Sequence, residues 1–116
     1  MALQIFGTRK CAVTRKAERF FKERGVDYHF VDLAEKGISP GELKAVLRGV
    51  KAEDLIDTSS RRYLDRGLAY MDFDIETELL ADPLLLRTPI VRDGGVVFAG
   101  DELKAWEDMA TSKKRG

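Results

Sequence analysis

The chain has 116 residues, which suits one domain, and its 20 Lys and Arg residues balance its 20 Asp and Glu residues. A neutral chain lacks the cationic excess that binds nucleic-acid phosphates, so nucleic acid is not an expected partner. No apolar run approaches the length of a signal peptide core or a membrane span, so neither a signal peptide nor a membrane partner is expected. One cysteine excludes an intrachain disulfide, which fits a reducing cytoplasm.

The first part of the chain has the pattern of a β-α-β unit. Residues 3–6 form a short apolar run that stops at Gly7, which predicts a buried strand. Residues 12–24 place apolar side chains on one helical face and charged side chains on the other, and Gly25 follows as a helix-ending residue. Residues 28–31 predict a second strand, which a helical crossover makes parallel to the first.

The middle of the chain is helical in pattern. Residues 39–42 read Ser-Pro-Gly-Glu, a capping box with proline at the first helical position. Residues 52–74 predict short helices and turns, and Asp74 is expected to cap a further helix that ends before Pro83.

The last part predicts a β-hairpin and a final helix. Residues 88–92 and 96–99 flank an Asp-Gly-Gly turn, Asp101 is expected to cap the helix, and residues 111–116 are expected to form a flexible basic tail. Residues 1–116 are therefore predicted to form a single α/β domain with a thioredoxin-like fold. Its mixed four-stranded sheet would carry a helical insertion between the β-α-β half and the β-hairpin-α half.

Cys11 lies where the first predicted strand passes into the first predicted helix. The unpaired N–H groups and the positive end of the helix dipole at this point favour the thiolate, which is the nucleophilic form. Lys10 and Arg15 add positive charge, and Arg15 could cover an anion held in the same loop. A lone cytosolic cysteine is otherwise a small buried hydrophobe, but the position of Cys11 favours an active thiol.

Thr14 occupies the place that a second cysteine takes in a Cys-x-x-Cys motif. Cys11 must therefore form a mixed disulfide with glutathione or with another protein's thiol. Two alternatives stay open for the Thr14 hydroxyl, which could bind the thiolate or cap the helix backbone. Two also stay open for Arg87, which could reach the same pocket or lie in solvent.

Several segments resemble the arsenate reductase (ArsC) family, which includes the Spx regulators. Residues 11–15, CAVTR, match the family's cysteine, two variable residues, Ser/Thr/Cys and arginine; residues 55–60 and 82–91 add support. The resemblance implies a thioredoxin-like fold and a cis bond before the proline that opens the hairpin strand. It also implies an oxidoreductase whose cysteine attacks arsenate, forms a mixed disulfide with glutathione and is regenerated by glutaredoxin.

The positions around Cys11 and the resemblance together indicate the site residues. Cys11 and Arg15 would be catalytic, with no bound cofactor, no metal and glutathione as co-substrate. The residues expected to bind the substrate or glutathione are Lys10, Thr14, Arg87, Thr88 and Pro89.

The chain departs from the arsenate reductases at two arginine positions. Thr88 stands directly before the hairpin-opening proline, where those enzymes have arginine, and Arg87 comes one residue early. Near Asp57 the closest arginines are Arg61 and Arg62, several residues late. A thiol substrate is therefore favoured over arsenate. The alternatives are a non-enzymatic Spx-like regulator that binds RNA polymerase or another protein, and a vestigial domain without chemistry.

Overall fold

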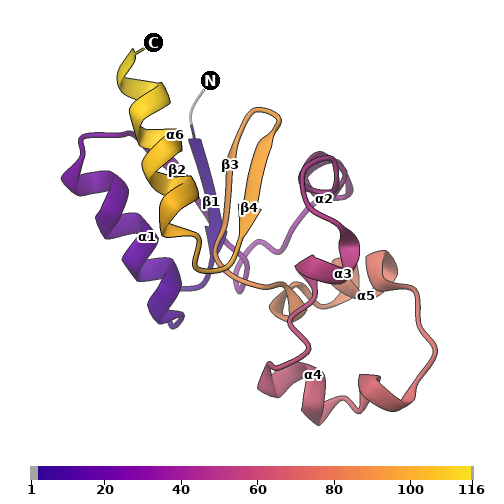
Figure 1. Ribbon diagram of the computed structural model, residues 1–116. Coiled ribbons are helices and arrows are strands. Elements are labelled where there is room, and N and C mark those ends of the chain that lie inside the picture. The colour runs from indigo at the N-terminus through magenta and orange to yellow at the C-terminus, as the bar shows by residue number, and fades with distance from the viewer. Residues whose placement is uncertain (1–2, 116) are drawn as a thin grey trace.

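The protein is described from a computed structural model that covers residues 3–115, and its elements follow the predicted order (Figure 1). The strands are β1 (Leu3–Gly7), β2 (Tyr28–Asp32), β3 (Ile90–Asp93) and β4 (Val96–Ala99). The α-helices are α1 (Ala12–Glu23), α2 (Pro40–Leu47), α3 (Ala52–Leu55), α4 (Arg61–Asp65), α5 (Ile75–Ala81) and α6 (Leu103–Arg115), and two short 3-10 helices are η1 (Leu68–Tyr70) and η2 (Pro83–Leu85).

The four strands form one mixed sheet in the order β2-β1-β3-β4. β1 and β2 are parallel, whereas β3 is antiparallel to both β1 and β4. The parallel pair and the hairpin confirm the α/β fold class predicted from the sequence. β2 and β4 are the two edges of this sheet.

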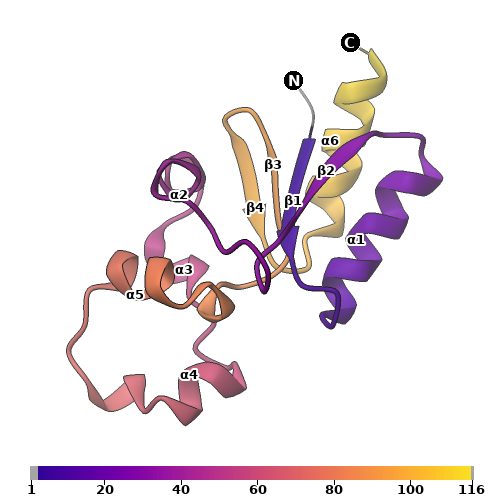
Figure 2. The same cartoon turned by 180° about the vertical axis from the view of Figure 1, so that it is seen from behind.

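The two faces of the sheet carry separate apolar clusters, because side chains alternate between faces along a strand. Ile5 points to the face that α1 and α6 cover, where Phe21 and Trp106 are fully buried. Phe6 points to the opposite face, where Val46 of α2 and the helical insertion complete a second core. Figures 1 and 2 show α1 and α6 together on one side and the insertion on the other.

The insertion is held together by ion pairs as well as by apolar contacts. Helix α4 has no fully buried residue. Its Arg62 Nε lies 2.7 Å from Asp82 Oδ2, and the nearby Arg66 binds both Asp82 and Glu78. Burial alone would raise the pKa of Asp82, but hydrogen bonds and charges from the two arginines hold it below its ordinary value. Arg62 is therefore engaged within the insertion.

The final helix differs from its prediction at both ends. Asp101 does not cap it, because α6 begins at Leu103 and the Asp101 carboxylate instead accepts hydrogen bonds from Lys16 Nζ at 3.0 and 3.1 Å. The helix also continues through most of the predicted tail, to Arg115. There Lys113 Nζ lies 3.0 Å from Asp93 Oδ1, which joins the helix to the hairpin.

Among the helices of residues 3–115, none is long and apolar enough to cross a membrane. The capping box at Ser39 and the Asp74 cap are both present as predicted, since each side chain accepts a hydrogen bond from the first turn of its helix.

Candidate active site

Cys11 is the N-cap residue of α1, at the end of the loop that follows β1. Its backbone is extended, with φ −78° and ψ 117°, and its N–H donates to the Thr8 carbonyl at 3.2 Å, which closes the loop. The side chain is a free thiol and is half-buried. Strand, loop and helix therefore present the sulfur at the N-terminus of α1, as predicted.

The loop before β3 supplies a hydrogen-bond donor to the thiol. Thr88 Oγ1 donates to Cys11 Sγ at 3.2 Å, across 77 positions of sequence. The Thr88–Pro89 bond is cis, which confirms the expectation drawn from the resemblance. The Pro89 carbonyl accepts a hydrogen bond of 2.9 Å from the N–H of Gly100, so this loop is also tied to the end of β4.

Thr14 lies beneath the thiol, fully buried against the end of β1. The approach is so close that a methyl group on Gly7 would clash with Thr14 Oγ1, which explains the glycine at this position. Within residues 3–115 the Thr14 hydroxyl has no hydrogen-bond partner of ordinary geometry. The thiol is nevertheless near enough for this hydroxyl to stabilise its charged form, which favours the thiolate-binding alternative over capping of the helix.

The pKa of the Cys11 thiol lies below its ordinary value. Burial is the largest influence and raises the pKa, but the hydroxyls of Thr14 and Thr88 and the backbone N–H groups of Thr14 and Val13 together outweigh it. These N–H groups face the sulfur without forming a capping hydrogen bond of ordinary geometry. The balance favours the thiolate and hence nucleophilic reactivity.

The predicted cations lie farther from the chemistry than the hydroxyls. Arg15 Nη1 donates to the Arg9 carbonyl at 2.7 Å, so its guanidinium braces the loop before Cys11. Arg87 Nε donates to the Asp54 carbonyl at 3.0 Å, on the side of the helical insertion. Lys10 is exposed and forms no hydrogen bond or ion pair with the other described residues. The structure thus brings Thr14 and Thr88 to Cys11, with Pro89 adjoining. Arg15 and Arg87 instead bind backbone carbonyls, and Lys10 is exposed.

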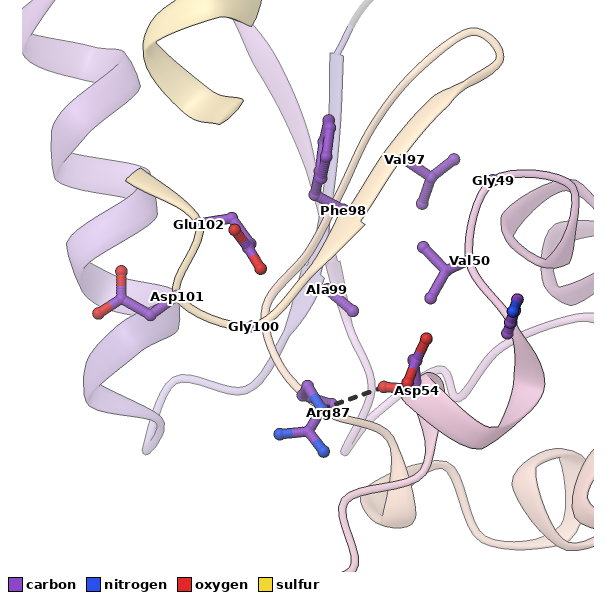
Figure 3. A pocket seen from close by; sticks show the side chains of 11 residues that line it. Gly49, Val50, Asp54, Arg87, Val97, Phe98, Ala99, Gly100, Asp101 and Glu102 are labelled. Carbon is purple, nitrogen blue, oxygen red and sulfur yellow. Dashed lines mark hydrogen bonds between the residues drawn. The ribbon is translucent and has the colours of Figure 1, made fainter. Parts of the chain in front are cut away.

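A cleft of about 620 Å³ opens beside this site and was not predicted from the sequence (Figure 3). Its walls are residues 49–51 and Asp54 on one side, β4 residues 97–99 on the other, and residues 100–102 and Arg87 at the base. Gly100 is needed here, because its φ is +91° and a side chain on it would lie 3.1 Å from Arg87 Cδ. The glycine that follows the β4 pattern was the one signal of this close approach in the sequence.

Comparisons with known proteins give relatives in sequence and in fold, although no family model matches the chain. The global transcriptional regulator Spx 2 of Bacillus cereus is 29% identical over 94 residues, which cover 77% of this chain and 72% of that protein. The solved structure of a YffB protein has a TM-score of 0.82 at 20% identity and covers 92% of this chain and 97% of its own. The arsenate reductase of Vibrio cholerae has a TM-score of 0.79 at 18% identity, and the match covers 93% of this chain and 97% of that one.

The structural likenesses, at this low identity, show a shared fold, and the likeness to Spx extends over most of the sequence. The resemblance to the ArsC and Spx family of thioredoxin-like proteins is therefore confirmed, in sequence by the Spx relatives and in fold by the ArsC-related structures.

Proposed function

We propose that the chain is a thiol-dependent reductase of the ArsC-like kind, with Cys11 as its nucleophile. The observation that carries the proposal is the hydrogen bond of 3.2 Å from Thr88 Oγ1 to Cys11 Sγ at the N-terminus of α1. The buried Thr14 hydroxyl, which has no other partner among residues 3–115, supports it independently. Both groups stabilise the thiolate that a disulfide exchange requires.

In the proposed reaction, the Cys11 thiolate attacks one sulfur of a substrate disulfide. A bond forms between Cys11 and that sulfur, the substrate's own disulfide bond breaks, and the second sulfur leaves as a thiolate that takes a proton from water. Because the chain has one cysteine, an external thiol must complete the cycle. Glutathione, or the thiol of glutaredoxin, attacks the substrate-side sulfur and releases the Cys11 thiolate, and a second glutathione frees the substrate thiol as oxidised glutathione forms.

The charges around the thiol support a disulfide substrate over arsenate. An oxyanion needs donors fixed where its charge develops, and arginines serve this purpose well. Here the donor beside the sulfur is the neutral hydroxyl of Thr88. Arg15 and Arg87 are each engaged by a backbone carbonyl, and Arg15 keeps its role in the proposal as the residue that braces the loop.

The sequence likeness to Spx 2, a global transcriptional regulator, supports a second candidate function. In this case the chain would bind RNA polymerase or another protein in a reducing cytoplasm without turning over a substrate. With no second cysteine to form an internal disulfide, Cys11 would sense oxidation by forming a mixed disulfide with glutathione.

Turnover of bis(2-hydroxyethyl) disulfide distinguishes the two candidates. The assay contains glutathione and glutaredoxin, and NADPH oxidation by glutathione reductase reports the oxidised glutathione that forms. We expect turnover by the wild type above the glutaredoxin background and none above it by Cys11→Ser, and we expect arsenate in place of the disulfide to give a lower rate. Absence of turnover with both substrates, together with capture of an RNA polymerase subunit, would favour the regulator.

A further inference from the structure

We propose that the cleft beside Cys11 binds an extended polypeptide segment along the free edge of β4, so that the substrate is a protein disulfide. This inference rests on the proposed thiol exchange and specifies its substrate class. It is carried by the backbone of β4, by the position of the cleft, and by the charges and apolar surfaces that line it.

The backbone of β4 offers unpaired hydrogen-bonding groups at this edge. β4 is the outermost strand, and its residues pair with β3 from Val96 opposite Asp93 to Ala99 opposite Ile90. Across the two-residue turn, Val96 and Phe98 direct their N–H and C=O groups toward β3, so Val97 and Ala99 direct theirs outward. No backbone partner for these outward groups is found within residues 3–115.

The edge is blocked at Val97 and open at Ala99, which is the next residue whose backbone groups point outward. Gly49 passes so near β4 that a methyl group on it would lie 3.3 Å from the Val97 nitrogen. At Ala99 the cleft of about 620 Å³ lies against the strand, and Val50 of the loop between α2 and α3 also lines it (Figure 3). An incoming chain can therefore pair with Ala99, at the end of β4 nearest the thiol.

A short series of contacts links the lining of the cleft to the thiol site. Gly100 follows Ala99, and its N–H donates to the Pro89 carbonyl at 2.9 Å. The residue before Pro89 is Thr88, whose hydroxyl binds the Cys11 sulfur. A polypeptide whose cysteine meets Cys11 thus needs only a few extended residues to reach the edge at Ala99.

The lining of the cleft favours a polypeptide over a small anion. Two cations, Lys51 and Arg87, are outnumbered by the carboxylates of Asp54, Asp101 and Glu102. A backbone edge, by contrast, matches the alternating donors and acceptors of an extended chain. Phe98, which is 37% exposed, offers apolar surface on one face of β4 to the side chains of that chain.

The experiment compares two activated disulfides that differ only in the length of the chain around the cysteine. One is the peptide acetyl-Lys-Val-Thr-Val-Cys-Val-Thr-Val-Lys-amide, and the other is acetyl-cysteine amide, each carrying a thiopyridyl group on sulfur. Attack by Cys11 forms the mixed disulfide and releases thiopyridone, which is followed by absorbance. With the wild type we expect the peptide to react at least about tenfold faster than the single residue, since the two backbone hydrogen bonds to Ala99 and the apolar contact with Phe98 add to its binding.

Ala99→Pro removes the outward N–H without removing a hydrogen bond of the β3–β4 ladder, as proline at a strand edge can. We expect it to slow the peptide about threefold to tenfold, the worth of one hydrogen bond, and to leave acetyl-cysteine amide unchanged. Ala99→Ser keeps the N–H and is the matched control, for which both rates should stay near those of the wild type.

The outcomes separate this inference from the proposed function. Equal rates for the two probes with the wild type would overturn peptide binding in the cleft while leaving thiol exchange in place. No reaction with either probe would overturn the proposed function itself. Should Ala99→Pro fail to fold, wild-type protein is tested with peptides N-methylated at the valines or at the threonines. Slowing by one set alone supports pairing at the edge, and slowing by neither refutes it.

Discussion

Replacing Thr88 with valine tests whether the hydroxyl beside the sulfur activates Cys11. Valine nearly keeps the shape of threonine and removes the donor that lies 3.2 Å from Sγ. Because that donor lowers the pKa of the thiol, the variant should have a higher thiol pKa and less thiolate at neutral pH. The Thr14 hydroxyl and the N-terminus of α1 remain, so the loss should be partial.

The size of the effect follows from the strength of one hydrogen bond. Bonds to charged groups contribute about 1.5–3 kcal/mol, and a half-buried sulfur, which is a weak acceptor, brings this to about 1 kcal/mol. A loss of about 1 kcal/mol lowers the ratio of thiolate to thiol about fivefold at a given pH. A thiolate of higher pKa is intrinsically about twofold more nucleophilic for this change, since nucleophilicity follows basicity with an exponent of about 0.4–0.5. The variant should therefore react about 2.5-fold more slowly below the pKa of the thiol and about twofold faster well above it.

Alkylation by iodoacetamide, measured by stopped flow from acid to alkaline pH, should show the two pH profiles crossing. Thr88→Ser keeps the hydroxyl and should retain the wild-type midpoint. A valine variant with an unchanged midpoint would show that the hydroxyl does not set the pKa of Cys11. Slowing by the same factor at every pH would indicate a structural disturbance instead.

Two further substitutions test the support of the site and of the insertion. Gly7→Ala forces a methyl group against the buried Thr14, so we expect a loss of about 1–3 kcal/mol in the free energy of unfolding, measured in urea. Gly41→Ala, in a helix with open space around it, should instead be neutral or stabilising by up to about 1 kcal/mol, and equal effects would refute the packing argument. Asp82→Asn should destabilise by about 1–2 kcal/mol at neutral pH through its weakened pairing with Arg62. The pKa of Asp82 is depressed in the folded protein, so the stability that its charge adds is fully present above the unfolded pKa of about 4 and is lost as pH falls through the folded pKa. A stability difference between wild type and Asp82→Asn that persists in acid would therefore show that the effect does not come from the charge of Asp82.

Local patterns predicted the order of the elements because each one is written in neighbouring residues. The apolar run before Gly7 and the helical periodicity after Cys11 placed the thiol at a strand-to-helix junction, where the structure has it. The resemblance added the cis bond at Pro89. These features depend on sequence spacing, and a single chain displays them directly.

Contacts between distant segments were beyond such patterns. The Thr88 hydroxyl meets Cys11 because β3 pairs with β1 in one particular register, which periodicity does not encode. Asp101 was expected to cap a helix because aspartate before an apolar periodic run is a strong local signal. Lys16 of α1 competes for that carboxylate in the folded chain, and the tertiary contact prevails. The cleft likewise exists only once the loop after α2 lies beside β4.

The groups that activate Cys11 also differ in kind from those that the sequence emphasised. Lys10 and Arg15 are exposed cations, and exposed charges act weakly on a neighbour because water and salt screen them. The hydroxyls of Thr14 and Thr88 are neutral and lie at the sulfur, where they act through direct contact. A site that relies on neutral donors stabilises a thiolate without gathering the positive charge that would also attract oxyanions. This arrangement supports the proposed preference for disulfides over arsenate, because the thiolate is stabilised here without arginines placed to hold an oxyanion.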